Sequence, residues 1–304
     1  MIPTLPEEVR ALYPFEPHWV NVGGRVLHYV DEGPRSPEAV VLLHGNPTWS
    51  FLYRKIIPTV ADAGYRVLAP DFLGSGRSDH GIHDDEYAIV NHIARTLAVL
   101  AEAGVQRAVM FMQDWGGPIG MGMELLRPGL LAGAVLANTF WGEASNFHRQ
   151  IFPWRAMHAP IAGALIFGRR GTFIQGLRLG GPPEVHDGPA WRAYGLPYEV
   201  HNASPGATLA WPRAIALGPD HPTYPLARAI WDVMPSFDVP TRFVWGMADA
   251  VFPWAEQGQT MRERLPRGSE HPVAEVPEGR HFVQEYAPEE CAQACIAVAK
   301  EALG

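Results

Sequence analysis

Short apolar segments recur along the chain and predict a sheet of roughly eight strands. The segment at residues 39–44 is apolar almost throughout, as expected for a central strand that is covered on both faces. The first two segments flank Gly23-Gly24, a sequence typical of a tight hairpin turn. In chain order, the predicted strands are residues 20–22, 25–30, 39–44, 65–70, 107–112, 134–138, 241–245 and 273–276.

Helical segments separate most of these strands. Residues 51–63 are helix-like, and residues 86–103 repeat apolar side chains at helical spacing, with Asp85 as a candidate cap and Gly104 at the end. A last helix is predicted over residues 288–303. Alternating strands and helices are typical of an α/β fold, in which helices cover both faces of a mostly parallel sheet.

The alternation stops after residue 140. Residues 142–216 are rich in Trp, Phe, Pro and Gly and contain no strand-like run, and this segment is too long for a loop. We therefore expect a core domain formed by residues 1–141 and 217–304, with a helical cap domain, residues 142–216, inserted into it. A ligand pocket is expected between the two domains.

The composition argues against several classes of protein. The formal net charge of −8 argues against a nucleic-acid-binding surface, and no apolar stretch approaches the roughly 18 residues of a membrane span. The N-terminal segment lacks the pattern of a secretory signal, which favours a cytoplasmic protein. Cys291 and Cys295 are interpreted as two packed thiols, because no further metal ligands follow at useful spacing. We therefore expect no metal or other cofactor.

An acidic residue stands where a strand is predicted to turn sharply into a helix. Asp114 follows the strand at residues 107–112 and precedes Trp115-Gly116-Gly117, whose glycines allow a tight turn. A carboxylate is an anion at neutral pH and can attack carbon directly, giving an ester on the protein. A serine esterase is excluded, because its nucleophile would be a hydroxyl at this position. Met112 is larger than the residue usual two positions before such a nucleophile.

Polar residues also follow other predicted strands. Asn46, Asp249 and His281 each come a few residues after a strand, where the catalytic groups of open parallel sheets gather. The chain order of nucleophile, acid and histidine (Asp114, Asp249, His281) is that of the α/β-hydrolase fold. His44 is interpreted as a structural hydrogen-bonding residue beneath the loop that follows it, and the Asn46–Pro47 bond as a candidate cis peptide.

Five motifs together resemble the haloalkane dehalogenases. The resemblance covers about residues 18–300, is weakest in the cap, and is most specific in the pair Asn46 and Trp115. The motifs are His-Gly-Asn-Pro-Thr-Trp at residues 44–49, Asp-x-x-Gly-x-Gly-x-Ser at 71–78, Gln-Asp-Trp-Gly-Gly at 113–117, Gly-x-x-Asp at 246–249 and Gly-x-His-Phe at 279–282.

The resemblance implies an α/β-hydrolase fold and a reaction in which Asp114 displaces halide from a small halogenated aliphatic substrate. Asn46 and Trp115 would hold the departing halide ion with side-chain N–H groups and bind an oxyanion with backbone N–H groups. His281, oriented by Asp249, would activate the water that hydrolyses the ester, which releases a primary alcohol, the halide ion and a proton. Self-association of the chain is left open.

The triad acid has a second possible position in this family, at the end of the strand before the cap. Residues 137–140 contain no carboxylate, so Asp249 is the preferred acid and Glu143 is the alternative.

Two other functions stay open. An epoxide hydrolase shares the aspartate nucleophile but must protonate its leaving group, usually with cap tyrosines, and Tyr194, Tyr198 and Tyr224 are candidates for that role. A non-catalytic binding protein with a hydrolase fold is the alternative of a different class, and a missing triad member would favour it.

Overall fold

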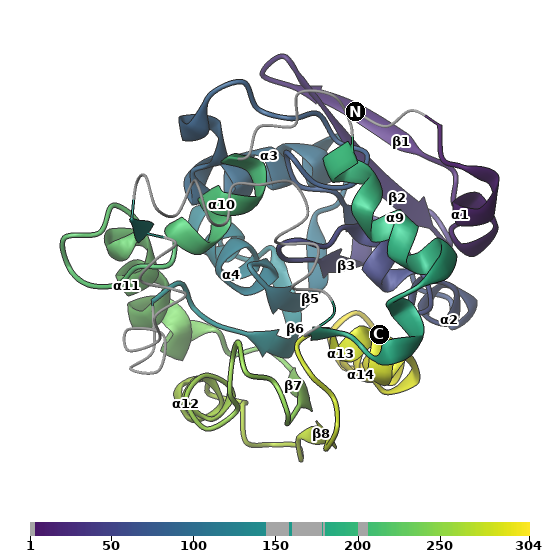
Figure 1. The fold of residues 1–304 in the computed structure, drawn as a ribbon. Coiled ribbons are helices and arrows are strands. Elements are labelled where there is room, and N and C mark those ends of the chain that lie inside the picture. The colour runs from purple at the N-terminus through teal and green to yellow at the C-terminus, as the bar shows by residue number, and fades with distance from the viewer. Residues whose placement is uncertain (1–3, 144–157, 160–177, 179, 200–205) are drawn as a thin grey trace.

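A single sheet of eight strands runs through the part of the chain that is described (Figure 1). The structure is a computed structural model and describes residues 4–143, 158, 159, 178, 180–199 and 206–304. The strand order is β1-β2-β4-β3-β5-β6-β7-β8; β2 pairs antiparallel with β1 and β4, and the remaining pairs are parallel. The strands are β1 (His18–Val22), β2 (Arg25–Glu32), β3 (Glu38–Leu43), β4 (Val67–Pro70), β5 (Arg107–Asp114), β6 (Leu131–Thr139), β7 (Thr241–Gly246) and β8 (Ala274–Val276).

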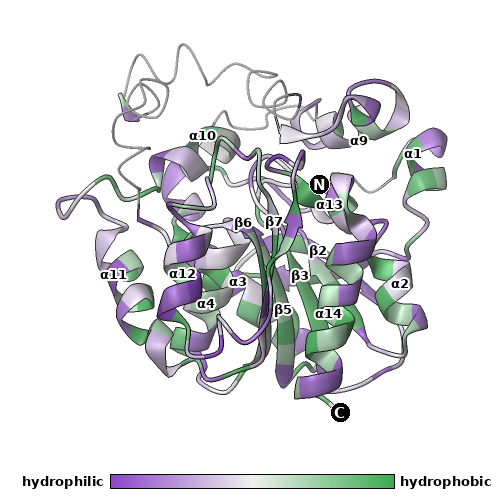
Figure 2. Cartoon of the chain, turned by 90° about the horizontal axis from the view of Figure 1, so that it is seen from below, coloured by the Kyte–Doolittle hydropathy of each residue, from purple (hydrophilic) through white to green (hydrophobic). Residues whose placement is uncertain are grey.

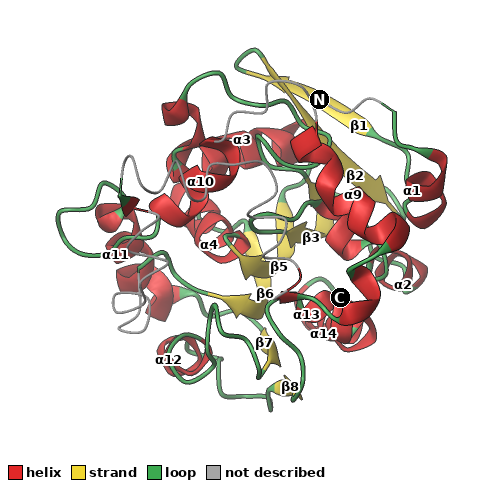
Figure 3. Cartoon of the chain, in the orientation of Figure 1, coloured by secondary structure: helices red, strands yellow, loops and turns green. Residues whose placement is uncertain are grey.

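Helices cover both faces of this sheet (Figures 2 and 3). On one face lie α3, α4, α11 and α12, and on the other lie α2, α13 and α14. The helices are α1 (Glu7–Leu12), α2 (Ile57–Asp62), α3 (Ile89–Glu102), α4 (Gly116–Leu126), α9 (Gly188–Glu199), α10 (Gly206–Arg213), α11 (Tyr224–Val233), α12 (Gly258–Arg264), α13 (Val283–Tyr286) and α14 (Pro288–Ala302). Short 3₁₀ turns are η1 (Ser50–Tyr53), η2 (Asp84–Tyr87), η3 (Pro183–Val185) and η4 (Met234–Ser236).

The central strand β3 explains why the sequence there is an uninterrupted apolar run. Val41 and Leu43 point into the core beneath α3 and α4, whereas Val40 and Leu42 point into the core beneath α2 and α14. Successive side chains of a strand face opposite sides, so a strand covered on both faces has no position that favours a polar residue.

Two local predictions about helices were wrong. The segment predicted as one helix at residues 51–63 is two elements, η1 and α2, because Pro58 lies in the first turn of α2, where a missing N–H is tolerated. Asp85 does not cap α3. It lies within η2, and the residue before α3 is Ala88, which makes no side-chain cap hydrogen bond.

The glycines and cysteines singled out in the sequence lie as expected. Gly23 and Gly24 form the β1–β2 turn with φ of +60° and +79°, a region that favours glycine. Gly104 ends α3 with φ of +72°. Cys291 and Cys295 of α14 are free thiols, and both are buried in the core on that side of the sheet.

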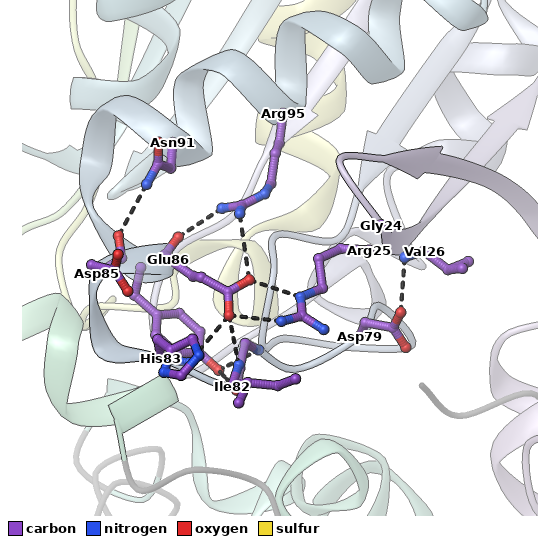
Figure 4. A network of polar contacts seen from close by, with 12 residues as sticks. Gly24, Arg25, Val26, Asp79, Ile82, His83, Asp85, Glu86, Asn91 and Arg95 are labelled. Carbon is purple, nitrogen blue, oxygen red and sulfur yellow. Dashed lines mark hydrogen bonds and ion pairs between the residues drawn. The ribbon is translucent and has the colours of Figure 1, made fainter.

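A polar network fixes η2 against the β1–β2 hairpin (Figure 4). Glu86 accepts hydrogen bonds from the Arg25 guanidinium at 2.7 and 2.8 Å and from the backbone N–H groups of Ile82 and His83 at 2.7 and 3.1 Å. These donors, with Arg25 foremost, lower the pKa of Glu86 to about 2. Because α10 packs against η2, the network supports the part of the core on which α10 rests.

Parts of the predicted cap are described, and they lie over the carboxyl ends of the strands. Tyr198 of α9 contacts Pro47, which follows β3, and Trp211 of α10 packs on Trp115, which follows β5. Much of 142–216 lies outside the described residues, so the domain boundaries stay a prediction. Among the helices that are described, none has both the length and the apolar character needed to cross a bilayer.

Candidate active site

Asp114 ends β5 in a backbone conformation that few side chains adopt. Its φ is +50°, and α4 begins two residues later. Gly116 and Gly117 make the turn possible, because a Cβ at either position would collide with Leu43 or Thr139. Strained backbone of this kind gathers at functional sites, where surrounding structure holds it.

Met112, the large residue before the elbow, is accommodated by a glycine. Its side chain is buried in the core beneath α4, and a Cβ at Gly120 of α4 would collide with its sulfur. Met112 therefore occupies the space that a side chain at position 120 would otherwise fill. The elbow keeps its tight turn.

The two carboxylate oxygens of Asp114 have different neighbours. Oδ1 accepts a hydrogen bond from the backbone N–H of Asn46 at 2.7 Å, and Oδ2 lies 3.5 Å from Nε2 of His281. Gly45 brings the chain this close, because a Cβ there would overlap the Asp114 carboxylate. One oxygen is thus oriented by the backbone, while the other faces the histidine.

His281 lies between two carboxylates. Its Nδ1 is 3.1 Å from Oδ2 of Asp249, on the side of the ring away from Asp114. Burial alone lowers the pKa of His281, but the negative charge of Asp249 and the hydrogen bond and charge of Asp114 outweigh burial and raise it to about 10. For Asp249, burial acts in the opposite direction and raises the pKa. The charge of His281 and the hydrogen bonds that Asp249 accepts outweigh burial and hold the pKa below its usual range.

Asn138 orients Asp249, a role that the sequence did not reveal. It lies near the end of β6 with φ of +40°, and its amide N–H donates to Oδ2 of Asp249 at 2.9 Å. The same side chain also binds the backbone of Gly246 at the end of β7. Its amide N–H donates to the Gly246 carbonyl at 3.1 Å, and its oxygen accepts from the Gly246 N–H at 2.8 Å. The backbone N–H of Val251 donates to Oδ1 of Asp249 at 2.7 Å. The position of Asn138 at a strand end was the available signal.

Two further polar side chains, also missed, brace the elbow. Thr139 donates its hydroxyl to the backbone carbonyl of Asp114 at 2.6 Å. Gln113 donates its amide to the backbone carbonyl of His281 at 3.2 Å, and the same nitrogen lies 3.3 Å from Nε2 of that ring. Gln113 lies within a motif and Thr139 at the end of β6, but only the folded chain brings them to their partners.

An aromatic wall runs from Trp115 to His281. The Trp115 ring meets Phe140 edge-on at 4.9 Å between centroids and lies 5.6 Å from Trp211. Phe140 stacks on Phe252 at 4.5 Å, and Phe252 lies 5.5 Å from the His281 ring. Buried rings between Trp115, next to Asp114, and His281 give a surface that suits an alkyl group rather than a charged one.

Several alternatives from the sequence can now be placed. His44 bonds the Gly45 carbonyl and receives the Phe72 backbone N–H at 3.1 Å, and burial lowers its pKa, so its structural interpretation is confirmed. Glu143 lies 4.0 Å from Arg228, whereas Asp249 contacts His281. The Asn46–Pro47 bond is cis.

Two of the three tyrosines considered for an epoxide hydrolase have other partners. Tyr194 donates its hydroxyl to Glu285 at 2.5 Å, and Tyr198 donates to the Pro47 carbonyl at 2.9 Å. Burial raises the pKa of both hydroxyls. Of the described residues, no three His, Cys, Asp or Glu side chains are grouped so as to hold a metal ion.

An aspartate at a strand–helix elbow, followed along the chain by an acid and a histidine at later strand ends, is the arrangement typical of an α/β-hydrolase. The family model of the alpha/beta hydrolase fold matches residues 38–170. A haloalkane dehalogenase of Mycobacterium marinum is 33% identical over 292 residues, which cover 93% of this chain and 94% of that protein. The chain belongs to the haloalkane dehalogenase family.

Solved structures are similar over nearly the full length. The haloalkane dehalogenase DpaA from Paraglaciecola agarilytica, described as tetrameric, has a TM-score of 0.77 and 27% identity, over 95% of this chain and 96% of that chain. DbeA from Bradyrhizobium elkani shares the fold with a TM-score of 0.85 and 22% identity, over 95% of this chain and 100% of that chain. The predicted fold and the predicted family of hydrolytic dehalogenases are therefore confirmed.

Proposed function

We propose that this chain cleaves the carbon–halogen bond of small haloalkanes with Asp114 as the nucleophile. The observation that carries the proposal is the placement of the Asp114 carboxylate, held through Oδ1 by Asn46 and facing His281 through Oδ2. A carboxylate in this position attacks carbon without a base, and a histidine paired with a second carboxylate serves the later attack by water. The overall reaction converts a haloalkane and water into a primary alcohol, a halide ion and a proton.

In the first step, an oxygen of Asp114 displaces the halide in line and becomes an ester oxygen. Negative charge passes from the carboxylate to the departing halide, so donors aimed at the halide act most strongly as the bond breaks. We assign these donors to the side-chain amide of Asn46 and the indole N–H of Trp115. Each hydrogen bond to a charged partner contributes about 1.5–3 kcal/mol.

The charge change at Asp114 also prepares the second step. In the resting enzyme, Asp249 and Asp114 together raise the pKa of His281 to about 10, so the ring is protonated at neutral pH. Alkylation turns Asp114 into a neutral ester and removes one of those two causes. The pKa of His281 then falls, which favours release of its proton to solvent as the proton among the products. A neutral base is thus available once the ester has formed.

Neutral His281 then takes a proton from water, and the hydroxide adds to the ester carbonyl of Asp114. The imidazolium that forms is stabilised by Asp249, which Asn138 orients. We assign the backbone N–H groups of Asn46 and Trp115 to the oxyanion. As this intermediate collapses, the imidazolium donates its proton to the departing alkoxide, which leaves as the alcohol. The new carboxyl group of Asp114, with one oxygen now taken from water, passes its proton to His281 and is a carboxylate again.

A single turnover in heavy-oxygen water tests this sequence of steps. With enzyme in excess over a short terminal bromoalkane, we expect the label in the peptide that contains Asp114 and unlabelled oxygen in the alcohol. Asp114→Ala is the control and should release no bromide. Label in the alcohol and none in the protein would contradict the proposal, as would diol formation from styrene oxide with no halide released from any haloalkane.

We infer in addition that the protein works in the cytoplasm and needs no metal or cofactor. Two free thiols packed inside α14 suit a reducing compartment. Activity should therefore persist after dialysis against a chelator. Self-association is proposed by analogy with the tetrameric relative, and light scattering after gel filtration measures it.

A further inference from the structure

Helix α9 is joined by hydrogen bonds to the loop that carries Asn46. The hydroxyl of Tyr198 donates to the carbonyl of Pro47 at 2.9 Å. Two residues further along the loop, the indole N–H of Trp49 donates to the carbonyl of Ala193 at 3.0 Å. All four groups are buried, so each bond is made away from competing water.

The Pro47 carbonyl lies in the same turn as the Asn46 N–H that contacts Asp114, two peptide units further along the chain. The backbone N–H of Asn46 donates to Asp114, and the turn is closed from within by Thr48, whose N–H and hydroxyl both donate to the Gly45 carbonyl at 3.0 Å. These contacts hold the start of the turn. Tyr198 holds its other side, from an element of the predicted cap.

We propose that Tyr198 is a positioning residue for Asn46, through which α9 sets the strength of halide binding. Its hydrogen bond fixes the Pro47 peptide and with it the direction of the neighbouring Asn46 side chain. The inference rests on the proposed function, in which Asn46 donates to the halide. The hydroxyl of Tyr198 donates to the turn and not to Asp114 or His281, so we expect it to act through the position of the turn.

The same helix supplies a matched control. Tyr194 lies one helical turn before Tyr198 and is also buried, but its hydroxyl donates to Glu285 of α13. Tyr194→Phe and Tyr198→Phe therefore make the same chemical change on one face of one helix. Only the second removes a donor from the Asn46 loop.

The experiment titrates bromide into each variant and follows quenching of the indole fluorescence. Trp115→Phe identifies the part of the signal that comes from Trp115. We expect Tyr198→Phe to bind bromide about two- to ten-fold more weakly than the unsubstituted protein, the range set by loss of one hydrogen bond. Tyr194→Phe should bind bromide unchanged, although its midpoint of thermal unfolding falls.

A second readout is the burst of halide in a single turnover. Tyr198→Phe should slow carbon–halogen cleavage by about the factor by which it weakens bromide binding, and leave hydrolysis of the ester unchanged. Equal bromide affinity in Tyr198→Phe and the unsubstituted protein would overturn the inference and leave the proposed function standing. Equal weakening in both tyrosine variants would overturn it too, since the effect would then be general destabilisation. Absence of bromide binding in the unsubstituted protein would overturn both.

Discussion

Two buried ionic clusters, one around His281 and one around Glu285, differ in how tightly their charges are paired. In the first, His281 lies 3.1 Å from Asp249 and 3.5 Å from Asp114. In the second, the Glu285 carboxylate accepts hydrogen bonds from the Arg54 guanidinium at 2.5 and 3.1 Å and from the Tyr194 hydroxyl at 2.5 Å. Each cluster pairs a cation with carboxylate away from bulk water, but the contacts of the first, at 3.1 and 3.5 Å, are longer than most of those in the second.

The difference lies in the cation and in how fully the carboxylate is used. Arg54 stays charged at every working pH, and with its partners it occupies both oxygens of Glu285. His281 can gain or lose its proton, and Oδ2 of Asp114 faces it only loosely. Tight and permanent pairing suits a structural role, whereas loose and titratable pairing suits the proposed nucleophile, Asp114, and the proposed base, His281.

The largest effect is expected from His281→Phe. Without a base, ester formation continues but hydrolysis stops, so turnover should fall by about 10⁴-fold. Mass spectrometry of the intact protein after mixing with a bromoalkane should show one alkyl group bound to the peptide that contains Asp114. An unmodified protein with normal turnover would place His281 outside the reaction.

Removing the cation of the second cluster should affect stability instead. Arg54→Met leaves Glu285 charged in a buried site, and such a loss costs about 3–5 kcal/mol in the free energy of unfolding. Lys55→Met is the matched control, because Lys55 approaches the same carboxylate at 3.0 Å but its side chain is 44% exposed; we expect less than about 1 kcal/mol. Urea titration measures both, and halide release per folded molecule should stay unchanged in each.

A smaller effect is expected from Asn138→Ala, which weakens the first cluster without removing a member. Asp249 loses an amide donor, and Gly246 loses its tie to β6. With the His281 ring less firmly oriented, ester hydrolysis should slow by about ten-fold, while the burst of halide release keeps its rate. Rapid-quench kinetics separate the two steps. Equal slowing of both would indicate a change in the whole fold.

The last prediction concerns the pH dependence of thermal unfolding, where the two clusters act at opposite ends of the pH range. The pKa of His281 is raised from 6.5 to about 10 in the folded protein, so its stabilisation is complete below about pH 6.5 and is lost as the pH rises through about 10. The pKa of Glu285 is lowered because Arg54 outweighs the effect of burial, so its stabilisation is present above its usual range and is lost in acid. His281→Gln should flatten the alkaline limb of the curve, and Glu285→Gln the acid limb. A scan that moves the other limb in either variant would contradict the assignment.

The strand pattern and the elbow were predictable because each depends on neighbours in the sequence. Alternate burial in β3 and the glycines after Asp114 produce local signals that a sequence displays directly. The wrong predictions at residues 51–63 and at Asp85 also concern local structure. There Pro58 restarts a helix and the turn η2 takes up Asp85.

Contacts between distant elements were not predictable. Asn138 meets Asp249 across 111 positions, and Arg54 meets Glu285 across 231. Asparagine and arginine are common at strand ends and on helices, and only the folded chain selects these two as partners. The members of the predicted triad could be proposed because each follows a strand end, whereas the groups that orient them carry no comparable mark in the sequence.

Because both thiols of α14 are buried, the folded protein should not react with thiol-reactive dyes. Neither Cys291 nor Cys295 can be reached by solvent, and burial raises the pKa of both, so little thiolate forms. A single cysteine placed at the exposed end of α9, such as Glu199→Cys, would then carry a maleimide fluorophore without background labelling. The native cysteines need not be replaced before movements of that helix are followed in real time.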